Sequence, residues 1–62
     1  MTFTHHDVLM AIQAWQLESV VTCREIKGKT ELTYNGETAM YPHWLAVRKA
    51  NQIGASYQSE AL

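Results

Sequence analysis

The side chains of this chain best suited to chemistry are three histidines and one cysteine. His5 and His6 are adjacent, His43 lies far along the chain, and Cys23 stands between them. Adjacent residues of a helix point about 100° apart, so His5 and His6 cannot chelate one ion from a single face. Zinc sites repeat their ligands at short fixed intervals, and no such spacing occurs here. We therefore expect no metal site.

Cys23 is the one thiol of the chain, so no internal disulfide can form. A reactive cysteine needs exposure and a nearby cation or base. Arg24 and Lys27 lie close in sequence, but strand alternation directs Cys23 inward. The chain also lacks a serine–histidine–aspartate order, a carboxylate pair and a glycine-rich phosphate loop. We expect a packed core cysteine, no cofactor and no enzymatic activity; chemistry by His43 and Cys23 is the distant alternative.

Five basic residues form two groups that could contact a nucleic acid. They are Arg24, Lys27 and Lys29 in one group and Arg48 and Lys49 in the other. Six acidic residues bring the net charge to −1, whereas proteins dedicated to duplex binding are usually strongly basic. Nucleic-acid binding through these five residues is therefore the alternative function, and protein binding is the first.

Two glycine dipeptides predict the strands that position these residues. Lys27-Gly28 and Asn35-Gly36 each permit a two-residue turn with positive φ, which makes residues 20–41 a three-stranded antiparallel meander. The first turn pairs Val21 with Tyr34, Cys23 with Leu32, Glu25 with Thr30, Thr22 with Thr33 and Arg24 with Glu31; the second pairs Tyr34 with Glu37, Thr33 with Thr38 and Leu32 with Ala39.

Helical patterns flank the strands on both sides. The first helix is expected over residues 5–18, with Thr4 as its N-cap. The second is expected over residues 42–53, because proline is favoured at the first helical position and glycine just past the end. A helix starting near Thr38 would place Pro42 at a costly interior position.

The expected fold is a small α+β domain of order α-β-β-β-α, with both helices on one face of the sheet. The domain spans residues 1–54, and residues 55–62 form a flexible C-terminal tail. If the third strand does not form, the order becomes α-β-β-α, a helix–hairpin–helix.

The first helix carries more apolar residues than one face can hold. One stripe contains Val8, Ala11, Ile12 and Trp15; a nearly opposite stripe contains Met10, Ala14 and Leu17. Either the second helix covers the second stripe, or part of it meets another protein. We predict an interface at Met10, Ala14 and Leu17, with Ile26 on the outer sheet face as a further contact. The aromatic residues expected in the core are Phe3, Trp15, Tyr34, Tyr41 and Trp44.

The length of 62 residues allows one domain of marginal stability, which association would strengthen. No segment reads as a signal peptide or a membrane span. We expect a cytoplasmic protein that binds another protein or itself as a homodimer.

The predicted order resembles double-stranded-RNA-binding domains and the related HicA-type toxin fold. Residues 36–43 resemble the third strand and Pro-His step of HicA-type proteins. Lys29-Thr30 occupies the position of that family's catalytic histidine, and Pro42-His43-Trp44 replaces the basic motif that opens the second helix of the RNA-binding domains. The resemblance thus implies architecture and not RNA cleavage. The helix–hairpin–helix alternative is similar, in order and length, to the small head–tail joining proteins of tailed phages. We expect a non-catalytic protein-interaction module of the kind that phages and mobile elements use as accessory proteins.

Overall fold

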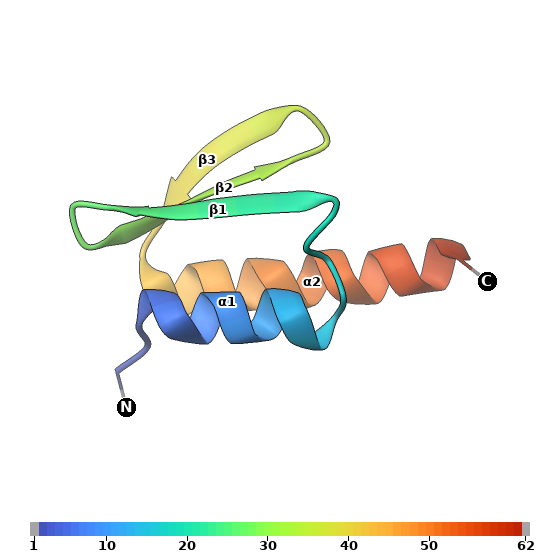
Figure 1. Cartoon of the computed structure of the whole chain (residues 1–62), viewed down its shortest axis with the longest axis horizontal. Helices are drawn as coiled ribbons and strands as arrows, with labels where there is room; N and C mark the ends of the chain where they lie inside the picture. The colour runs from blue at the N-terminus through green and yellow to red at the C-terminus, as the bar shows by residue number, and fades with distance from the viewer. Residues whose placement is uncertain (1, 62) are drawn as a thin grey trace.

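The computed structural model describes residues 2–61 and has the order α-β-β-β-α. Its elements are α1 (His5–Ala14), β1 (Val21–Ile26), β2 (Lys29–Tyr34), β3 (Glu37–Tyr41) and α2 (His43–Ala61). The strands form one open antiparallel sheet in the order β1-β2-β3. Figure 1 shows both helices side by side on one face of that sheet, with α1 under β1 and β2 and α2 under β2 and β3. The predicted α+β fold is confirmed, and the α-β-β-α alternative does not apply.

Both strand reversals use left-handed backbone. The φ angles are 50° and 77° at Lys27 and Gly28, and 58° and 80° at Asn35 and Gly36. Positive φ at both central residues is the mark of a type I′ turn, whose twist matches that of the strands. The predicted register is confirmed at every pair in both hairpins.

The helix α2 begins at the position that Pro42 indicates in the sequence. The carbonyl of Pro42 accepts a hydrogen bond from the amide of Ala46 at 2.9 Å, so Pro42 forms the first turn although the helix is assigned from His43. Proline suits this place because the first amides of a helix have no partner within it.

The helix α1 ends at Ala14, so the predicted end near Glu18 is wrong. Gln16 adopts φ 57°, and the chain reverses around it. The amide of Gln16 bonds to the carbonyl of Gln13 at 3.0 Å, and that of Leu17 bonds to the carbonyl of Ile12 at 2.9 Å. These two bonds make a Schellman motif, which satisfies carbonyls that the helix end leaves free.

That reversal returns Leu17 to the core, where its side chain is 0% exposed. The prediction of an exposed stripe through Leu17 is therefore wrong, since the periodicity of a continuous helix does not hold beyond Ala14. The buried apolar residues that surround it are Val8, Ile12, Val21, Leu32, Ala46 and Ala50.

The expected helix end at Gly54 is also wrong. The helix α2 continues to Ala61, so residues 55–61 extend the helix where a tail was expected; Leu62 lies outside the described residues. Gly54 is buried inside the helix, and a Cβ built there would overlap the side chain of Trp15. This glycine serves close packing between helices and not a left-handed helix end.

Candidate functional site

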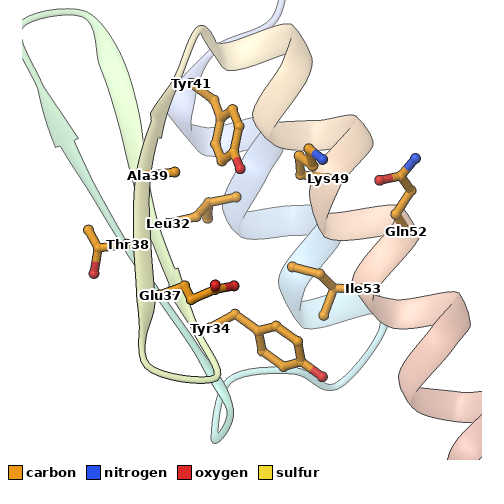
Figure 2. Close-up of a pocket in the computed structure, with 9 residues that line it drawn as sticks. All are labelled: Leu32, Tyr34, Glu37, Thr38, Ala39, Tyr41, Lys49, Gln52 and Ile53. Carbon is orange, nitrogen blue, oxygen red and sulfur yellow. The ribbon is translucent and has the colours of Figure 1, made fainter.

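A groove opens between β3 and α2, on the side of the sheet that faces the helices. It has a volume of about 440 Å³. Figure 2 shows side chains from both walls pointing into it. The lining residues are Leu32, Tyr34, Glu37, Thr38, Ala39, Tyr41, Lys49, Gln52 and Ile53. It exists because α1 lies under β1 and β2, which leaves α2 alone beneath β3.

The floor of the groove is apolar and its rim is polar. Leu32 is buried, while Ala39 and Ile53 are half-buried beside the opening. At the rim, the ammonium of Lys49 lies 5.9 Å from the centre of the Tyr41 ring, within reach of a cation–π interaction. An apolar floor with a few polar groups at its margin is typical of a binding site.

Glu37 brings a carboxylate to the same rim. It points inward from β3 but is exposed, because no helix covers that end of the strand. Within the part of the chain that the structure describes, neither Glu37 nor Lys49 takes part in an ion pair. Both charges of the groove therefore remain available to a ligand.

The groove adjoins the free edge of β3, the last strand of the open sheet. The type I′ turn closes on the pair Tyr34 and Glu37, and hydrogen-bonded pairs then alternate along the hairpin. The backbone groups of Ala39 consequently face β2, and those of Thr38 and Met40 face outward. An edge with unsatisfied amides and carbonyls can accept a further strand.

Two histidines that are distant in sequence lie close together. The ring centres of His5 and His43 are 6.4 Å apart. Nδ1 of His5 lies 3.1 Å from the hydroxyl of Thr30, and Nε2 of His43 lies 3.3 Å from a carboxylate oxygen of Glu25. Each contact joins the first turn of a helix to the β1–β2 hairpin, a convergence that no sequence spacing signalled.

On the side of the sheet, the contact of His5 ends at a buried hydroxyl. Thr30 is 0% exposed, so a substrate cannot reach the hydroxyl beside His5. Across the described residues, no three histidine, cysteine, aspartate or glutamate side chains are placed to hold a metal ion. The contacts of His5 and His43 hold the helices against the sheet.

Cys23 is half-buried and packs against the core, as the strand alternation predicts. Burial raises the pKa of its thiol above the ordinary value of 9.0, because desolvation disfavours the thiolate. A thiol held in this form is a poor nucleophile.

The five basic residues do not gather on one face. Arg24 lies on the outer side of the sheet, where its Nε donates to a carboxylate oxygen of Glu31 at 2.9 Å. Lys49 lies on the helix side, at the groove. Exposed Lys27 and Lys29 flank the tip of the first hairpin, and exposed Arg48 lies on α2.

The interface residues expected from sequence are likewise dispersed. Met10 and Ala14 are exposed on α1, with Met10 at 54%, whereas Leu17 belongs to the core. Ile26 is half-buried at the end of β1. Of the expected core aromatics, Phe3 and Trp44 are 37% and 50% exposed and line a shallow hollow with His43 and Thr2.

Sequence reasoning did not identify the groove, although one signal pointed to it. The register places Glu37 on the inward side of β3, together with Ala39 and Tyr41. A charged residue at an inward position indicates that nothing covers the sheet there, since an unpaired charge is rarely buried.

Comparison of the chain with protein-family models, curated proteins and solved structures finds no match. In residues 2–61, neither helix combines the length and apolar character that crossing a membrane requires.

Proposed function

We propose that this chain is a non-catalytic protein-interaction module whose binding surface is the β3–α2 groove together with the free edge of β3. The observation that carries the proposal is their adjacency: a groove of about 440 Å³, with an apolar floor and a polar rim, opens beside a strand that has a neighbour on one side only. Use of such a module by a phage or mobile element stays a prediction.

The ligand that fits both features is an extended segment of protein. Its backbone would pair with the outward groups of Thr38 and Met40, as in recognition by strand addition. Alternate side chains of that segment would point to the helix side, where Tyr34, Tyr41 and Ile53 offer apolar contacts. Main-chain pairing would supply affinity and the groove would supply selectivity.

Nucleic-acid binding has less support. Because Arg24 and Lys49 lie on opposite sides of the sheet, a phosphate backbone that runs along one side of the sheet would not contact both residues. The salt bridge to Glu31 also reduces the charge that Arg24 presents.

Site-specific photo-crosslinking tests the proposal in cells that make the protein. One variant carries p-benzoylphenylalanine at Tyr34, in the groove; a matched variant carries it at exposed Thr22, on the outer sheet face. We expect protein adducts from position 34 alone, and binding that persists at high salt because apolar association is not screened. Equal protein adducts from both positions, or nucleic-acid adducts that disappear with salt, would overturn the proposal.

A further inference from the structure

We infer that the occupant of this surface is a second copy of the chain, docked by antiparallel pairing of two β3 strands about a twofold axis at Ala39. The inference rests on the proposed function, since it names the partner of that same surface. The result would be a continuous six-stranded sheet formed from two three-stranded sheets.

The strand register supports this twofold arrangement. Thr38 and Met40 present the outward backbone groups of β3, and Ala39 lies midway between them. About an axis at Ala39, Thr38 of one copy faces Met40 of the other. The outward amides and carbonyls of each copy can therefore form hydrogen bonds with those of the second copy. With the axis at Thr38 or Met40, outward backbone groups would still face each other. However, an axis at Thr38 places the end of β3 opposite the β2–β3 turn of the second copy, and an axis at Met40 places Thr38 opposite Pro42. Only the axis at Ala39 pairs the whole strand Glu37–Tyr41.

The charges of the groove are complementary in the same register. On the helix side, Glu37 of one copy lies opposite Tyr41 of the other, and the ammonium of Lys49 lies 5.9 Å from that ring. Each carboxylate therefore approaches the Lys49 ammonium of the second copy, and the symmetry forms this contact twice. At the axis, two Ala39 side chains meet and leave room for the backbones to approach.

The opposite edge of the sheet is less suited to a partner. The inward side of β1 is covered by α1, and Val21 there is only 4% exposed. Neither of the two hollows described above has a lining residue on β1. Self-association through β3 alone uses both the edge and the hollow.

Charge-swapped variants, with mass measured by light scattering over a wide range of protein concentration, test the inference. Wild type should convert from one chain to two as concentration rises. Glu37→Lys and Lys49→Glu should each raise the dimer dissociation constant by about tenfold or more, because like charges would then face each other. An equal mixture of the two variants should dimerise nearly as well as wild type. Glu18→Lys carries the same charge change as Glu37→Lys outside β3 and α2, and it should leave the constant unchanged.

The inference is overturned if the wild-type protein keeps the mass of one chain at every concentration. It is also overturned if neither charge-swapped variant raises the dissociation constant, or if the mixture of the two variants stays monomeric. Circular dichroism of each variant must show the wild-type fold, so that a lost dimer is not a lost domain. The photo-crosslinker at Tyr34 separates the two proposals. If the protein is monomeric and forms adducts with a different protein, the proposed function stands and the dimer is rejected. If the protein is monomeric and forms no adduct, both the proposed function and the dimer are rejected.

Discussion

The indole of Trp15 lies directly against the backbone of Gly54, at the point where the end of α1 meets the middle of α2. A Cβ on Gly54 would overlap two ring atoms and lie 2.8 Å from the Cβ of Trp15. The indole is also held by a hydrogen bond from its Nε1 to Oδ1 of Asn51 at 2.9 Å. This contact fixes how closely the two helices approach.

Replacing Gly54 with alanine should therefore destabilise the domain. Helix propensity alone favours alanine over glycine by about 1 kcal/mol, but overpacking against Trp15 costs about 1–3 kcal/mol. We expect a net loss of stability in urea unfolding followed by circular dichroism. In a Trp15→Ala background the same substitution should lose most of its penalty, because both overlapping ring atoms are gone. A stabilised Gly54→Ala variant would contradict this packing.

The left-handed turn at Gln16 predicts a stabilising substitution. A residue with a Cβ pays about 1–2 kcal/mol in this conformation, whereas glycine does not. After the extra chain entropy of glycine is subtracted, Gln16→Gly should raise the unfolding free energy by about 0.5 kcal/mol. Gln13→Gly, inside the regular helix, should instead lose about 1 kcal/mol. Equal effects at both positions would show that α1 does not end as described.

Burial distinguishes Leu17 from Met10, with which the sequence pattern grouped it. Leu17→Ala should cost about 2–5 kcal/mol, the range found for buried leucines. That is close to the whole stability of a domain this small. Met10→Ala, at a side chain 54% exposed, should change stability by less than about 0.5 kcal/mol. Unfolding of both variants by urea checks the contrast. A Leu17→Ala variant as stable as the wild-type protein would show that Leu17 is not part of the core.

The local signals of the sequence sufficed for the fold but not for the groove. Lys27-Gly28 and Asn35-Gly36 specify turns through backbone conformation, which depends on few neighbours, so both hairpins follow from them. Gly54 shows where such reasoning fails: a glycine that ends a helix and a glycine that admits a tryptophan look alike in sequence. The groove depends on the lateral placement of α1 and α2 beneath the sheet, and only Glu37 marked it in advance.

The raised pKa of Cys23 predicts a loss of stability at alkaline pH. The folded state holds the thiol proton more tightly than the unfolded state, whose thiol titrates near its ordinary value of 9.0. The contribution of Cys23 is therefore fully present below that pH and is lost as pH rises through the folded pKa. The free energy of unfolding, measured in urea as the pH is raised from below 9.0 to above it, should decline less in Cys23→Ala than in the wild-type protein. Identical declines in both proteins would contradict the desolvated thiol.

Amide hydrogen exchange, measured by NMR at increasing protein concentration, tests the central claim most directly, namely that two copies of the chain pair through the free edge of β3. The amides of Thr38 and Met40 face outward in a single chain and should exchange quickly at low concentration. We predict that both slow as concentration rises, while those of Cys23 and Glu25 on the free edge of β1 keep their rates. Unchanged exchange at Thr38 and Met40 throughout, or slowing at Cys23 and Glu25 instead, would contradict the claim that β3 is the edge that pairs.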